Sequence, residues 1–120
     1  MIFIANVLVA VVAALHIYFL ILEMFLWTKS LGLKTFRNSI EKATESAVLA
    51  ANQGLYNGFL AAGLAWGLLQ PNPAFAFQIK VFFLLCVIVA GAYGAATVSR
   101  RILYVQAAPA ALALILLLLA

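Results

Sequence analysis

Two residues in the first apolar stretch could move a proton or hold a charged group, namely His16 and Glu23. They are seven residues apart, so on a helix they lie within roughly 20° of each other, and Trp27 follows one turn further along the stripe. Histidine titrates near neutral pH and suits general acid–base chemistry with a carboxylate. A rise of about 10.5 Å between the two residues places a substrate or a water molecule between them. His16 and Glu23 are therefore the candidate catalytic residues.

A second group of polar side chains lies in the string Asn52-Gln53-Gly54-Leu55-Tyr56-Asn57-Gly58. On a helix, its amide and tyrosine side chains fall within an arc of about 140°. The opposite face carries small residues at steps of four, which allow close approach of another helix. This small-residue ridge serves either packing within one chain or a homodimer through Gly54, Gly58 and Ala62.

The polar residues of the first and second expected helices lie at similar depths in the membrane. Counted from the cytoplasmic ends of antiparallel helices, Glu23 is level with Asn52 and Gln53, and His16 is level with Asn57. Polar side chains inside a membrane are costly and usually face the bundle interior. We therefore predict a polar pocket in the cytoplasmic half of the bundle, whose ligand-binding residues are His16, Glu23, Trp27, Asn52, Gln53, Tyr56, Asn57 and Tyr93.

Structural alternatives exist for the same residues. Interhelical hydrogen bonds of Asn and Gln side chains can simply hold helices together, at about 0.6 kcal/mol each. Glu23 lies near the expected interface, where a carboxylate can extend toward the lipid headgroups. One histidine, one cysteine (Cys86) and one carboxylate within a span fall short of the four ligands of a structural zinc site. The sequence thus predicts no metal and no cofactor.

The composition defines the class of protein that must position these groups. Of the 120 residues, 68% are hydrophobic and 8% are charged, whereas a soluble domain is about 45–50% apolar and about 25% charged. This balance excludes a cytosolic enzyme domain and a nucleic-acid module, and the lone cysteine excludes a disulfide scaffold within the chain. Membrane lipids are the expected partners.

Since one spanning helix needs about 20 residues, four of them use nearly the whole chain. We expect an all-α fold, an integral membrane antiparallel four-helix bundle that forms one transmembrane domain over residues 1–120. Asn38 and Glu41 fit a capping box that starts a helix near Ser39, and Pro109 is expected to kink the last span. The expected spans are residues 3–27, 47–69, 75–98 and 102–120, with a polar connection at 28–46.

Six of the seven basic residues lie in the first and third connections, at Lys29, Lys34, Arg37, Lys42, Arg100 and Arg101. By the positive-inside rule, these connections face the cytoplasm and both termini face outward. Lys80 is the one basic residue near the outer connection.

The motif His16-Ile17-Tyr18, the segment Leu22 to Trp27 and the string Asn52 to Gly63 give the chain a resemblance to a known family. Over its full length it resembles the small bacterial four-helix membrane proteins catalogued as domain of unknown function 1304. The resemblance implies four spans in the bacterial cytoplasmic (inner) membrane, and it supplies no substrate, cofactor or catalytic residue.

Three functions remain open from the sequence. The first is binding or transport of a small or lipid-like molecule in the polar pocket. The second is an intramembrane isomerase or epimerase, in which His16 and Glu23 exchange a proton with the substrate. The third is a structural or accessory membrane protein, in which the polar residues only set the helix register.

Overall fold

The computed structural model describes residues 1–97 and 100–120. Every regular element in this part of the chain is helical, which confirms the all-α class. The end of the third predicted span, Val98, and the residue after it, Ser99, lie outside the described residues. The elements are α1 (Ile2–Met24), α2 (Ser30–Phe36), α3 (Ile40–Glu45), α4 (Ala47–Leu69), α5 (Pro73–Thr97), α6 (Arg100–Ile102), the π-helix η1 (Leu103–Ala107) and α7 (Ala108–Leu119).

Two of the described helices are long and apolar enough to cross a membrane, α1 and α5. The apolar segment Tyr104–Leu119 is shorter. Helix α4 occupies the range predicted for the second span, but its amide side chains make it more polar than α1. Length and composition thus support a membrane location, while the four-span bundle and the single transmembrane domain stay predictions.

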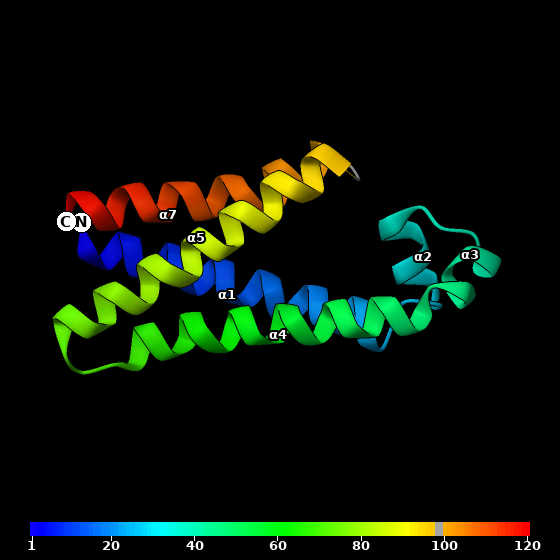
Figure 1. The fold of residues 1–120 in the computed structure, drawn as a ribbon, viewed down its shortest axis with the longest axis horizontal. Helices are drawn as coiled ribbons and strands as arrows, with labels where there is room; N and C mark the ends of the chain where they lie inside the picture. The colour runs from blue at the N-terminus through cyan, green and yellow to red at the C-terminus, as the bar shows by residue number, and fades with distance from the viewer. Residues whose placement is uncertain (98–99) are drawn as a thin grey trace. The chain divides into compact units, whose positions relative to one another are not determined.

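The chain divides into two compact units, which we call the larger and the smaller unit. The larger unit consists of Met1–Leu15 and Leu60–Ala120, and the smaller unit is His16–Phe59. Within the larger unit, α5 and α7 run side by side (Figure 1). Its core is a cluster of aliphatic side chains from α1, α4, α5 and α7, namely Ala5, Val9, Val12, Ala13, Leu64, Leu84, Val87, Ala110, Ala113 and Leu117.

Asn72 ends the connection between α4 and α5 and caps the second of these helices. Its side-chain oxygen Oδ1 accepts a hydrogen bond from the backbone N–H of Phe75 at 3.0 Å. The backbone N–H of Asn72 in turn donates to Oε1 of Gln70 at 3.2 Å. Pro73 occupies the first helical position, where a missing N–H costs nothing. Helix α5 therefore begins two residues before the predicted start at 75.

The interruption predicted at Pro109 takes the form of a π-helical turn. The π-helix η1 ends at Ala107, and Pro109 lies in the first turn of α7. Proline removes one backbone donor and crowds the preceding turn, and a π turn accommodates both effects. The last apolar segment is therefore a continuous helix that changes from π-helical to α-helical geometry at Ala108.

Gly91 allows α5 to approach η1 closely. A Cβ atom at this position would lie 2.7 Å from the Cβ of Ala107 and 2.9 Å from its backbone nitrogen. Ala107 is itself buried, so neither side can yield without moving backbone. This contact fixes the register of α5 against the π turn.

We expect Gly91→Val to lower the free energy of unfolding by about 1–3 kcal/mol, since overpacking a closed contact forces the backbone apart. The measurement is denaturant unfolding in detergent micelles, followed by helical circular dichroism. Ala92→Val is the matched control, because Ala92 is exposed one residue away. Equal stabilities of the two variants would contradict the contact.

In the smaller unit, two short helices join the end of α1 to the start of α4. Helix α2 was not expected, and it ends at Arg37, which has the left-handed φ of 55°. Helix α3 is capped by Ser39, whose side chain accepts a hydrogen bond from the backbone N–H of Lys42 at 3.2 Å. The helix start predicted near Ser39 is confirmed, but the capping residue is Ser39 and not Asn38.

Candidate functional site

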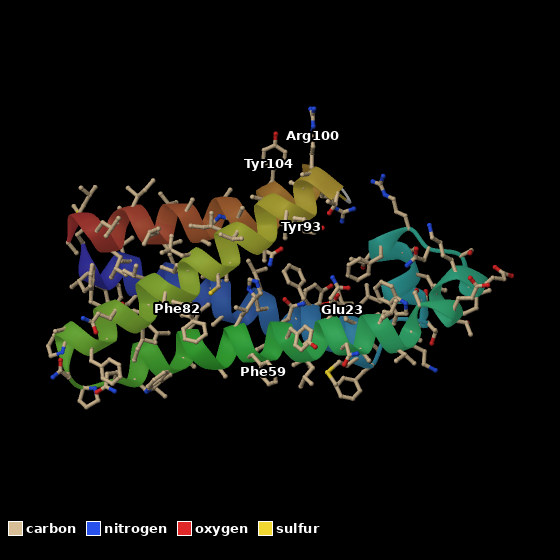
Figure 2. All side chains as sticks on the ribbon, in the orientation of Figure 1. Glu23, Phe59, Phe82, Tyr93, Arg100 and Tyr104 are labelled. Atoms are coloured by element: carbon tan, nitrogen blue, oxygen red, sulfur yellow. The ribbon has the colours of Figure 1, made fainter. Side chains whose placement is uncertain are left out.

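Glu23 is a buried carboxylate on the C-terminal part of α1, in the smaller unit (Figure 2). Its side chain is 6% exposed, and its Oε1 accepts a hydrogen bond from Nδ2 of Asn57 on α4. Because an unpaired buried carboxylate is costly, this bond compensates part of the burial. Glu23 and Asn57 therefore form the centre of the site.

The two helices can come this close because Gly54 has no side chain. A Cβ atom there would lie 2.6 Å from Cγ of Met24, 3.1 Å from Cβ of Glu23 and 3.2 Å from the carbonyl oxygen of Leu20. Gly58 lies next to the same leucine, since its Cβ would be 2.7 Å from Cδ1 of Leu20. Both glycines of the predicted ridge thus pack against α1 of the same chain. The homodimer through Gly54, Gly58 and Ala62 stays a prediction.

His16 lies two turns before Glu23 on α1 and is completely buried. Its ring makes an edge-to-face contact with Phe19, with the ring centroids 5.4 Å apart. Seven residues of helix separate the two titratable groups, a rise of about 10.5 Å. Two buried polar groups therefore lie two turns apart on a predominantly apolar helix.

Trp27 has a different position from the one expected. Helix α1 ends at Met24, so the regular stripe stops at Glu23. Nε1 of Trp27 donates a hydrogen bond to Oγ of Ser46 at 3.2 Å, and the indole packs against Phe36 at 4.9 Å between ring centroids. In the smaller unit, Trp27 therefore ties α2 and the start of α4 to the end of α1.

Most of the α4 side chains that were predicted to line the pocket point away from Glu23. Asn52, Gln53 and Tyr56 are exposed, and Asn57 is half-buried. The arc is about 140° wide, whereas Asn57 is only about 60° from Gly54, which faces α1. Tyr93 is 72% exposed and belongs to the larger unit. Of the predicted ligand-binding residues, the structure shows a direct contact between Glu23 and Asn57.

The structure pairs Glu23 with a different residue of α4 from those that the depth count predicted. Glu23 is hydrogen-bonded to Asn57, whereas equal depth was expected to place it beside Asn52 and Gln53. The depth count took Trp27 as the end of the first helix, but that helix ends at Met24. Two short helices then separate α1 from α4, so no tight turn fixes their register.

Sequence reasoning missed a second polar contact, in the larger unit, in which one partner is buried. Lys80 is 6% exposed, and its Nζ donates a hydrogen bond to Oδ1 of Asn6 at 2.8 Å. The signal was in the sequence, because Lys80 is the one charged residue between Glu45 and Arg100. A lone charge inside a long apolar helix is a marker of a buried polar contact.

Within residues 1–97 and 100–120, no group of three His, Cys, Asp or Glu side chains lies close enough to hold a metal ion. The buried polar groups that the structure describes, those of His16, Glu23 and Lys80, can form hydrogen bonds, pair with charges and transfer protons.

The fold and the site define an all-helical protein with two candidate membrane helices and buried polar residues within them. The chain belongs to the family described as protein of unknown function (DUF1304), whose model matches residues 10–118. It is similar to the uncharacterized protein YpaA of Lactococcus lactis subsp. lactis (strain IL1403), with 29% identity over 115 residues. The match covers 93% of this chain and 95% of that relative. Among solved structures, none matches this chain.

Proposed function

We propose that the protein is a multi-pass membrane protein that binds or transports a small or lipid-like molecule at the polar site of the smaller unit. The observation that carries the proposal is the buried carboxylate of Glu23, hydrogen-bonded to Asn57 within an apolar helix. Ionisable side chains in such helices are expensive and commonly belong to a ligand or ion pathway.

The neighbours of Asn57 indicate the chemistry of the ligand. Gln53 lies one turn before Asn57 on α4 and is exposed. The amides of Gln53 and Asn57 are therefore neighbours on one face of that helix. The second oxygen of Glu23 is an acceptor with no hydrogen atom of its own when ionised. We therefore propose a ligand that donates hydrogen bonds to Glu23, such as an amine or a hydroxyl compound, and that contacts Gln53 and Asn57.

The membrane location rests on α1 and α5, and the location in the bacterial inner membrane is part of the proposal. The polar connection between α1 and α4 carries four basic residues, Lys29, Lys34, Arg37 and Lys42. The positive-inside rule supports a cytoplasmic position for this connection, with both termini outside. The polar site would then open from the cytoplasmic half.

The test is to identify by mass spectrometry the molecules that co-purify with the full chain in native lipid discs. Glu23→Gln removes the charge but keeps an oxygen that accepts from Asn57, so the fold is preserved. We expect its ligand occupancy to fall roughly tenfold to hundredfold, the equivalent of one charged hydrogen bond. Glu41→Gln is the control, because Glu41 is exposed on α3 and should retain the ligand.

Two results would overturn the proposal. One is a wild-type protein without any stoichiometric bound molecule, and the other is equal occupancy in Glu23→Gln and the control. Either result, with the stability of the fold unchanged, would favour the structural role in which Glu23 and Asn57 only set the helix register.

A further inference from the structure

A second site is suggested by the position of Lys80 in the larger unit. This residue lies two turns into α5, and only 6% of its side chain is exposed. Its ammonium group donates to Oδ1 of Asn6 on α1 at 2.8 Å. The amide of Asn6 is neutral, so the bond satisfies one donor and does not by itself balance the positive charge.

The lysine side chain is held in place along its length. A Cβ atom at Gly67 would lie 2.6 Å from Cγ of Lys80 and 3.3 Å from its backbone nitrogen. The absence of a side chain at Gly67 therefore makes room for the methylene stem between α4 and α5. With the stem packed there and the head bound to Asn6, the ammonium group has a fixed direction.

No acidic side chain of the larger unit can balance this charge. The three acidic residues of the chain are Glu23, Glu41 and Glu45, and all of them belong to the smaller unit. A buried ammonium without a negative partner is costly, and such groups usually pair with an anion. The larger unit thus has no acidic side chain that could serve as the negative partner of Lys80.

A hollow of 510 Å³ lies beside the lysine, at the end of the larger unit where the two termini lie close together (Figure 1). Its polar lining includes Asn6, Gln70 and Lys80, and its walls include Ile2, Phe77 and Leu118. A volume of this size is typical of small-molecule sites. The lining combines one positive group with both polar and apolar side chains.

We propose that this hollow binds an anionic amphiphile, whose carboxylate or phosphate head pairs with Lys80 and whose acyl chain lies along the apolar wall. A free fatty acid and an anionic phospholipid share this chemistry. The site is separate from the polar site around Glu23, and it does not depend on the function proposed for that site.

The test is native mass spectrometry of the full chain in an uncharged detergent, titrated with oleate or with phosphatidylglycerol. Methyl oleate and phosphatidylcholine are the matched probes without a net negative charge. We expect one anionic probe to bind at one molecule per chain, at least tenfold more tightly than its matched probe. Preference for oleate identifies a fatty acid as the ligand, and preference for phosphatidylglycerol identifies a lipid headgroup.

Substitutions test whether Lys80 is the residue that binds the anionic probe. Lys80→Gln is expected to weaken the anionic probe at least tenfold, and Lys80→Arg is expected to retain it. Lys29→Gln removes an exposed charge from the smaller unit and should change nothing. Ile2→Trp fills the hollow from an exposed position, so it should weaken binding with the fold intact even if Lys80→Gln does not fold.

Equal binding of the charged and uncharged probes would overturn the proposal. So would an affinity that Ile2→Trp and a folded Lys80→Gln both leave unchanged. In that case Lys80 would only extend toward the bulk headgroups, as lysines near helix ends do.

Discussion

Replacing Asn57 by leucine is expected to lower the free energy of unfolding by about 1–3 kcal/mol, since a buried acceptor then loses its donor. Glu23 is 6% exposed, so water cannot readily replace the lost amide. The measurement is denaturant unfolding in detergent micelles, followed by helical circular dichroism. Asn52→Leu is the matched control on the same helix, where the amide is exposed and the expected change is within about 0.5 kcal/mol.

A double variant makes this prediction sharper. Removing both members of a buried hydrogen bond in favour of apolar groups can be nearly neutral. The combination of Glu23→Leu and Asn57→Leu should therefore be more stable than Asn57→Leu alone, although it carries one more substitution. Simple addition of the two single effects would show that the bond between the two side chains carries no coupling energy.

Gly32→Ala is expected to destabilise the smaller unit by about 1–3 kcal/mol, the typical cost of overpacking. A methyl group at this buried position would overlap the carbonyl oxygen of Leu26 and lie 3.1 Å from the Cα of Trp27. Both are backbone atoms of the turn after α1, so no side chain can move aside. Without the clash, the same change in a helix would stabilise it by up to about 1 kcal/mol.

The sign of the change is thus the measurement for Gly32→Ala, obtained from unfolding curves and from Trp27 fluorescence in a Trp66→Phe background. Ser30→Ala is the control on α2, at an exposed position. A Gly32→Ala protein as stable as the control would mean that α2 does not pack on the turn after α1.

The long helices were predictable because hydrophobic runs and prolines mark them directly. The run from Ala47 to Leu69 and the prolines after it place α4 where the structure has it. Helix α2 was missed because it has seven residues, no side-chain cap and a glycine in its first turn, within the most hydrophilic stretch of the chain. Its end at Arg37 depends on a left-handed backbone conformation, which arginine does not signal.

For the site, helical periodicity predicted which α4 residues share a face but not which edge of that face meets α1. The contact of Gly54 with Leu20, Glu23 and Met24 decides this, and it selects Asn57 rather than Asn52. Such a contact depends on the register of α1 against α4. The connecting segment 28–46 is too long to fix that register. Lys80 and Asn6 are 74 positions apart in the chain, so tertiary packing alone joins them.

The π-helix before α7 has a consequence for comparing members of this family. A single π turn equals an α-helix with one residue inserted, and the surplus residue is absorbed without ending the helix. Relatives that lack the turn should therefore align with this chain only when a one-residue gap is opened within Leu103–Ala107. A gap placed elsewhere would rotate the buried positions Ala110, Ala113 and Leu117 by about 100° and pair them with exposed residues.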